Sequence, residues 1–206
     1  MLASNAIPLY GVVAQQWDGI DVIVLYLIET GIIGIFHALR LFSFGTFLGF
    51  KDGKTPKTSI FFTLFFLFHY FMFFFVQSAL FFGFMSDSHH AIKDGFNVFY
   101  NYSLYFKEPF LISIYAFIFN QMVYTGRELM INHPYNHLSP GEYMFLPYTR
   151  IFVQQFVVIF GAMVFLIFNS VTALVVFFII LKTIGEYLGQ KYGERWLKPH
   201  VKKKAK

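Results

Sequence analysis

Long apolar stretches separated by short polar connections form the main pattern of this chain. Apolar segments cover residues 21–41, 59–84 and 109–131, and a further stretch continues from residue 148 to residue 188. A helix needs about 20 apolar residues to cross the roughly 30 Å hydrocarbon core of a bilayer. These lengths therefore predict membrane-spanning segments.

The predicted spans are helices and not strands. Residues 59–68 show no alternation of apolar and polar side chains, which a membrane β-strand would require. The stretch 148–188 would measure about 60 Å as one helix, so we expect a tight hairpin at residues 168–170 and two spans near 148–168 and 171–188. The predicted fold is an all-α, polytopic transmembrane helix bundle with five full spans. The short apolar segment 2–13 precedes them, either as a stunted span, a re-entrant piece or a surface helix.

Two local patterns add detail to these helices. Gly31 and Gly34, followed by Ala38, give the first long helix a face of small residues suited to close helix packing. Farther along the chain, Ser139 and Glu142 have the spacing of a capping box, which predicts the start of a short surface helix.

The composition agrees with a membrane protein. Hydrophobic residues make up 57% of the 206 residues and charged residues only 13%, whereas soluble domains carry about 25% charged residues. Phe accounts for 31 residues, and we interpret it as a lipid-facing replacement for Leu rather than as the lining of a pigment, quinone or lipid-tail site. The absence of Cys excludes disulfides, thiolate metal sites and cysteine nucleophiles.

The positions of the basic residues predict an orientation. Fourteen of the 16 Lys and Arg residues fall in the 40–57 loop, the 127–150 connection and the region from 182 to the C-terminus, which leaves only Lys93 and Lys107 on the other side. The positive-inside rule then predicts a multi-pass protein of the cell membrane with a cytoplasmic C-terminus. We divide the chain into a transmembrane domain, 1–190, and a basic cytoplasmic tail, 191–206. The tail is expected to meet anionic lipid and not nucleic acid.

Polar residues in the middle of the apolar segments are the candidate functional residues, because an ionisable side chain at membrane depth is costly. Glu29 and His69 lie near the middle of the first and second long helices. A carboxylate and an imidazole that converge in a dry bundle can bind a divalent metal, relay a proton or hold a substrate. Both residues are therefore candidate metal ligands, and the possible cofactor is a divalent metal. The wider candidate cluster contains Glu29, His69, Gln77, Gln155, Asn120 and His37.

A purely structural role is the competing interpretation of each polar residue. Glu29 and His69 then form hydrogen bonds that hold helices together, and Asn120 and its neighbours do the same. At the inner ends of the helices we expect Arg150 to pair with Glu128.

Several motifs resemble an uncharacterised family of small bacterial and archaeal polytopic integral membrane proteins. They are Asn5-Ala6-Ile7-Pro8-Leu9 with Trp17-Asp18, Tyr26-Leu27-Ile28-Glu29-Thr30 with Gly34, Phe68-His69-Tyr70, and Pro147-Tyr148-Thr149-Arg150-Ile151. The resemblance implies that Glu29 and His69 occupy typical positions of that family, and that the positions of Gln77 and Gln155 are often His. This chain departs there, and two Gln residues would weaken a metal site.

Three functions remain open from the sequence. The favoured one is a membrane protein that binds or transports an ion or small molecule through a central polar cluster around Glu29 and His69. A metal-dependent membrane enzyme and an accessory or scaffold subunit of a membrane complex are the alternatives. The protein partners that remain open are a second copy of the chain, in a homo-oligomer, and the subunits of a membrane complex. No nucleophile motif or phosphate-binding loop supports an enzyme.

Overall fold

A computed structural model describes residues 19–51, 53–86, 91–130, 137–148 and 151–152. Within them the regular secondary structure is helical, apart from one isolated bridge between Phe50 and Gly53. The elements are α2 (Gly19–Ser43), the π-helix η1 (Phe44–Leu48), α3 (Pro56–Met85), α4 (Val98–Ser103), α5 (Leu111–Met130) and α6 (Pro140–Met144).

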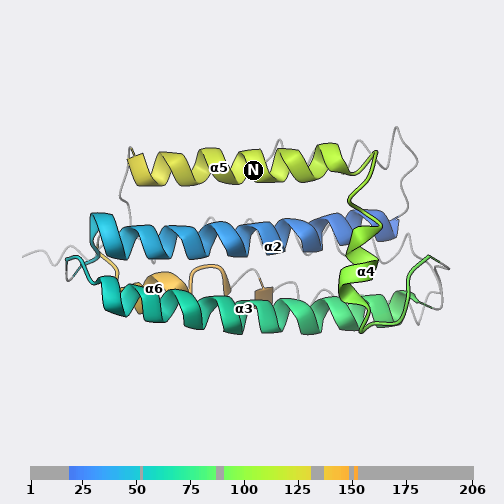
Figure 1. Ribbon diagram of the computed structural model, residues 1–206, viewed down its shortest axis with the longest axis horizontal. Helices are drawn as coiled ribbons and strands as arrows, with labels where there is room; N and C mark the ends of the chain where they lie inside the picture. Colours follow the sequence, from blue (N-terminus) through green and yellow to red (C-terminus); the bar gives the residue numbers. More distant parts are fainter. Residues whose placement is uncertain (1–18, 52, 87–90, 131–136, 149–150, 153–206) are drawn as a thin grey trace, which may run out of the picture.

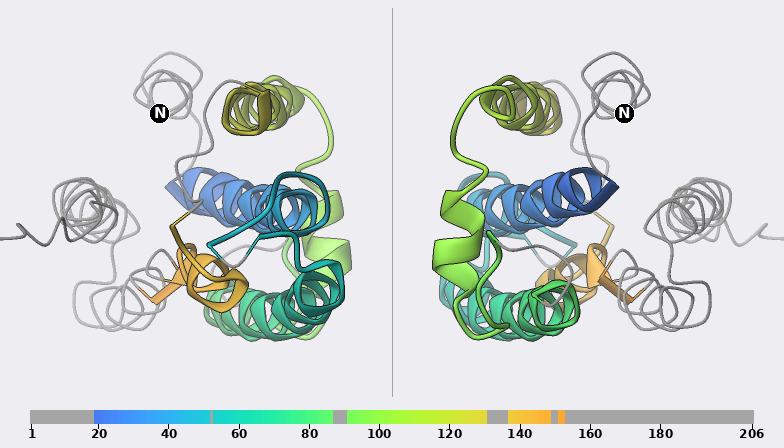
Figure 2. Two further views of the ribbon diagram at one scale, coloured as in Figure 1. Left: turned by 90° about the vertical axis from the view of Figure 1, so that its left-hand side faces the viewer. Right: turned by 90° about the vertical axis from the view of Figure 1, so that its right-hand side faces the viewer.

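The three long helices form one layer with α2 in the middle. Figure 1 shows α5 and α3 on opposite sides of α2, with α4 crossing one end and α6 near the other. The end views of Figure 2 show the same row of helices. Because α2 and α5 run in the same direction and α3 runs oppositely, the η1–α3 loop and the last turn of α5 lie at one end of the layer (Figure 1).

The expected helices at 21–41 and 59–84 are confirmed and are slightly longer than predicted. α2 continues directly into η1, and Pro56 begins α3 at a position where a missing N–H costs nothing. The turn between them uses Gly49 and Gly53, whose φ angles of 98° and 83° lie in the left-handed region that favours glycine. The connection between α3 and α5 contains the short helix α4.

The five-span count is not supported by the described residues. Two candidate spans, Ile20–Leu48 and Pro56–Met85, are long and apolar enough to cross a membrane by length and composition. The expected third span, 109–131, contains the helix α5, which is not among these candidate spans. Residues 2–13, the spans near 148–168 and 171–188, their hairpin and the tail lie outside the described residues.

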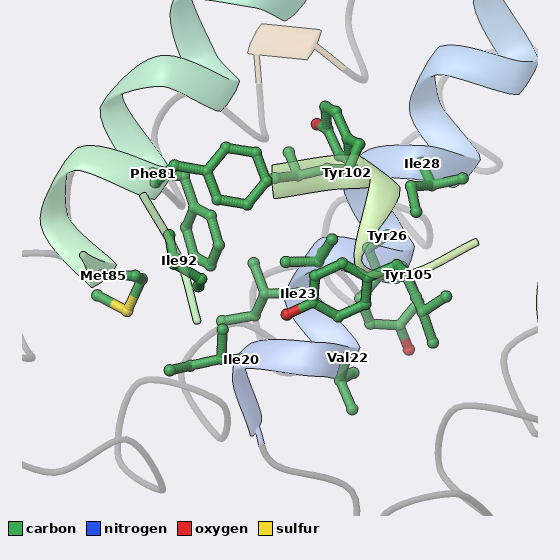
Figure 3. Close-up of a cluster of buried hydrophobic side chains, with 14 of the residues drawn as sticks. Ile20, Val22, Ile23, Tyr26, Ile28, Phe81, Met85, Ile92, Tyr102 and Tyr105 are labelled. Carbon is green, nitrogen blue, oxygen red and sulfur yellow. The ribbon is translucent and has the colours of Figure 1, made fainter. Parts of the chain in front are cut away.

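Two clusters of buried apolar side chains hold the layer together. One lies at the end where α4 crosses and combines the first turns of α2 with the last turns of α3 and the start of α5; Figure 3 shows Ile20, Ile23, Phe81, Met85 and Tyr105 among its members. The other lies at the opposite end, where α2, α3 and α6 meet.

α2 and α3 pack closely together at the predicted small-residue face. The ring of Phe74 packs on Gly31, and the ring of Tyr70 packs on Gly34. Tyr70 is fully buried and donates its hydroxyl hydrogen to the carbonyl oxygen of Thr30 at 2.9 Å. Glycine is required at position 34, because a Cβ atom there would overlap the Tyr70 ring.

We expect Gly34→Ala to destabilise the protein by about 1–3 kcal/mol, since the hydrogen-bonded Tyr70 ring has no room to retreat. Gly126→Ala on α5 is the matched control: a Cβ there meets nothing within 4 Å. That change should stabilise the helix by about 0.5–1 kcal/mol. Denaturant unfolding of the purified variants in detergent measures both effects, and equal stability of the two variants would contradict the packing described here.

Candidate functional site

The described polar side chains gather around Arg40, near the end of α2. Arg40 is 4% exposed, and its neighbours come from α5 and α6. The charge count of the sequence analysis includes Arg40 in the 40–57 loop, whereas α2 continues to Ser43 and Arg40 is buried within the bundle.

Arg40 donates hydrogen bonds to two helices at once. Its Nη1 lies 2.9 Å from the Thr125 hydroxyl and 3.5 Å from Oε1 of Gln121, both on α5. Its Nε donates to the hydroxyl of Tyr143 on α6 at 3.2 Å. The guanidinium also lies over the ring of Tyr124, 4.9 Å from the centroid, where the ring face attracts the charge.

Glu128 supplies the opposite charge. Its Oε2 lies 3.4 Å from Arg40 Nε, and both side chains are at least nine-tenths buried. The same Oε2 has no hydrogen-bond partner within the described part of the chain. The short distance without a hydrogen bond is explained by Arg40 Nε, which carries a single hydrogen and donates it to the Tyr143 hydroxyl. Glu128 therefore stabilises Arg40 by charge and not by an aligned hydrogen bond. The expected partner of Glu128, Arg150, lies outside the described residues.

His37 belongs to the same cluster. Its Nε2 lies 3.1 Å from the backbone carbonyl of Tyr143, and its ring stacks on the Tyr143 ring with centroids 4.6 Å apart. A carbonyl oxygen only accepts hydrogen bonds, so Nε2 must carry the hydrogen. The histidine thus fixes the backbone of α6 while Arg40 holds the Tyr143 hydroxyl.

A capping box holds α6 in place from its other side. The Ser139 hydroxyl accepts from the backbone N–H of Glu142, and the Glu142 carboxylate accepts from the backbone N–H of Ser139 at 2.8 Å. This confirms the capping pattern expected from the sequence. The hydrogen bonds from Ser139 favour the charged carboxylate and lower the pKa of Glu142.

Gln77 is the most unusual polar residue of the candidate cluster. It lies on α3, seven residues after Tyr70 and therefore on the α2 side of the helix, and it is fully buried. Within the described residues neither its Oε1 nor its Nε2 has a hydrogen-bond partner. The adjacent Ser78 is also buried but is fully engaged, with the Phe74 carbonyl at 2.7 Å and the Tyr102 hydroxyl at 2.7 Å.

Glu29 is buried on α2, on about the same side of the helix as Arg40. It precedes Arg40 by eleven residues, which is three helical turns plus about 20°. His69 on α3 is partly buried, and its Nδ1 lies 2.8 Å from the hydroxyl of Tyr148. The hydrogen bond of His69 thus runs toward the segment after α6, and direct pairing of Glu29 with His69 stays a prediction.

The remaining candidates do not enlarge the site. Asn120 is half-buried on α5 beside Gln121, and Gln155 lies outside the described residues. Among the described residues no group of three or more His, Cys, Asp or Glu side chains is arranged to hold a metal ion. The expected divalent metal therefore receives no support from this part of the chain.

The Arg40 cluster was missed by the sequence analysis, although a signal was present. Gln121, Thr125 and Glu128 follow each other at spacings of four and three residues, which places them on one face of α5. His37 and Arg40 have the same relationship on α2. Two polar stripes on neighbouring helices indicate a buried polar contact, and only the pairing of the helices was needed to locate it.

We expect Arg40→Met to cost about 3–5 kcal/mol, because it leaves the carboxylate of Glu128 buried without its counter-charge. The double variant Arg40→Met/Glu128→Leu should recover much of that loss. Arg127→Met, at an exposed position next to Glu128, is the control and should change stability little. The free energy of unfolding of each variant is measured in detergent. If Arg40→Met lowers it no more than Arg127→Met does, the ion pair does not contribute to stability.

Comparison with known proteins gives one match. No curated protein and no solved structure matches the chain. A family model described as a family of unknown function, DUF6498, matches residues 1–203, which is nearly the whole sequence. The uncharacterised family suggested by the sequence motifs is thereby confirmed, and the chain belongs to the family of unknown function DUF6498.

Proposed function

We propose that this chain is an integral membrane protein whose helices enclose a polar interior, and that this interior binds or conducts an ion or a small polar molecule. The observation that carries the proposal is the distribution of polar and apolar side chains around α5. Polar residues of α5 face the bundle and apolar residues face outward, which is the reverse of a helix on the surface of a soluble protein.

The inversion on α5 is clear on both faces. Four of its six buried residues are polar, namely Ser113, Gln121, Thr125 and Glu128. Apart from Arg127 in the last turn, its exposed large side chains are apolar or aromatic: Ile112, Tyr115, Phe119, Met122, Val123 and Met130. Water would favour the opposite arrangement, whereas a lipid solvent favours this one.

The outer face of α3 also indicates that lipid is the surrounding solvent. It exposes a long row of large apolar side chains: Ile60, Phe61, Leu64, Phe65, Phe68, Met72, Phe75, Val76, Leu80 and Phe84. Soluble proteins rarely expose apolar patches of this extent. A core helix of a soluble protein would pass the same length and composition test, but it would bury this row. We therefore place α2, α3 and α5 across a bilayer.

The full topology rests on the sequence pattern. We propose five full spans and the short N-terminal segment, with the 51–57 loop and the C-terminal tail in the cytoplasm. The common end of the η1–α3 loop and the last turn of α5 in Figure 1 is compatible with this orientation.

Gln77 favours a binding role over a purely structural one. A residue that only holds helices together is expected to have partners, as Arg40 and Ser78 do. Burying both polar atoms of an amide without partners costs stability, and Leu or Met would fill the same space without that cost. Glu29, buried on the neighbouring helix α2, adds an ionisable group to the interior.

A scaffold subunit is the second candidate. The Arg40 cluster favours it, because its ion pair and hydrogen bonds join α2, α5 and α6 into one unit. The two functions differ in what Gln77 contributes. In a scaffold it is dispensable, and in a binding protein it is needed despite its cost.

We expect Gln77→Leu to stabilise the bundle by about 1–3 kcal/mol, since it removes two buried polar atoms that lack partners. Ser78→Ala is the matched control at the next position of α3. It should destabilise by a similar amount, because it leaves the Tyr102 hydroxyl buried without its partner. Thermal unfolding in detergent measures both, and a destabilising Gln77→Leu change would show that the amide has a structural partner.

Cysteine accessibility tests the membrane placement directly, because the chain has no native Cys. Phe68 is 74% exposed on α3, and Lys54 is exposed in the preceding loop. In vesicles we expect Lys54→Cys to react with a water-soluble maleimide supplied from its own side of the membrane, whereas Phe68→Cys should react only after unfolding. Lys93→Cys, near α4, should react from the opposite side. Rapid labelling of Phe68→Cys in intact vesicles would exclude a lipid-facing α3.

A further inference from the structure

The two ends of the helix layer differ in their exposed charge. At the end shared by the η1–α3 loop and the last turn of α5, Lys51, Lys54, Lys57 and Arg127 are all exposed (Figure 1). We call these four residues the basic end. The loop itself, residues 51–57, carries three Lys residues against one Asp.

The described acidic side chains near the basic end are engaged elsewhere, and Asp52 of the loop lies outside the described residues. Glu128 is buried against Arg40, and this is the ion pair found among the described residues. Glu142 feels the charge of Lys51 but uses its carboxylate to cap α6 through Ser139. Within the described residues none of the four exposed cations forms an ion pair with an acidic side chain.

The opposite end of the layer does not share this property. Lys93 lies over the ring of Tyr100, with its Nζ 3.8 Å from the centroid, and it is followed directly by Asp94. Lys107 is followed by Glu108, and Asp21 lies in the first turn of α2. Its described charges are thus close to balanced, with a slight excess of acid.

Exposed apolar side chains surround the basic end. Phe47 and Leu48 end η1, Phe61 lies in the second turn of α3, and Phe145 and Leu146 follow α6. Apolar side chains beside flexible lysines are typical of a surface at the membrane boundary, where the rings enter the acyl region and the ammonium groups reach the phosphate level.

We infer that the basic end binds the phosphate groups of anionic phospholipids. The inference rests on the proposed membrane placement and adds a lipid partner to it. Lysines supply mobile point charges that suit a dispersed layer of headgroups, and each basic residue near such a surface raises binding by a factor of roughly five. The surface differs from the basic tail predicted from the sequence, since it is formed by the loop and the helix ends.

The test uses the purified full chain in detergent and three additives: phosphatidylglycerol, phosphatidylcholine and inorganic phosphate. We expect phosphatidylglycerol to raise the thermal unfolding temperature, and the other two to have little effect. The triple variant Lys51→Gln/Lys54→Gln/Lys57→Gln should lose most of that rise. The control Lys93→Gln/Lys107→Gln should keep it. The basic tail is unchanged in every variant, so the difference reports the loop.

Each contrary outcome has a distinct meaning. Equal shifts with phosphatidylcholine, or a full phosphatidylglycerol shift in the triple variant, would overturn the inference. An equal shift with inorganic phosphate would replace the lipid by a free anion and would also overturn it. Failure of the membrane placement itself appears separately, as rapid labelling of Phe68→Cys in vesicles, so the two failures can be told apart.

Discussion

The close approach of α2 and α3 sets the geometry on which the rest of the structure depends. Gly31 and Gly34 remove the side chains that would keep the two helices apart, and Phe74 and Tyr70 fill the space. Gly45 in η1 allows a similar close approach, because its backbone packs directly on the side chain of Ser59. We call these three contacts between α2–η1 and α3 the glycine seam. They fix the relative register of the helices, because sliding one helix along the other would push the Phe74 ring, the Tyr70 ring or the Ser59 hydroxyl into the opposite backbone. The Tyr70 hydrogen bond to Thr30 then depends on that register.

Because glycines and aromatic rings fill the glycine seam, the charged residues of α2 lie on other faces of the helix. Arg40 points to α5 and α6: its ion pair with Glu128 joins α2 to α5, and its hydrogen bond to Tyr143 joins α2 to α6 at one end of the layer. The arrangement separates two tasks. Apolar packing brings the helices together, and a single buried charge pair selects how α5 and α6 sit against α2, because a misplaced Arg40 would lie in an apolar interior without compensation.

Local features of the fold were predictable because they are encoded within short segments. The apolar lengths of 21–41 and 59–84, the small-residue face at Gly31 and Gly34, and the cap formed by Ser139 and Glu142 each need only a few neighbouring residues. The candidate site was harder to predict. The choice of Glu128 for Arg40 depends on which helices are adjacent, and the burial of Gln77 without a hydrogen-bond partner in the described part of the chain depends on which side chains surround it. Such information is tertiary, and helical spacing alone leaves several pairings open.

The two candidate spans are longer than the hydrocarbon core of the bilayer in which we place them. The 29 residues of Ile20–Leu48 and the 30 residues of Pro56–Met85 correspond to about 44 and 45 Å of helix, compared with a hydrocarbon core of roughly 30 Å. Hydrophobic mismatch of this size is relieved by tilting or by local thickening of the bilayer. Since the glycine seam holds α2 and α3 in register, they would have to tilt together as a rigid pair. The thickness of the surrounding membrane would then set the tilt of the whole layer, and with it the depth at which Glu29 and Gln77 lie.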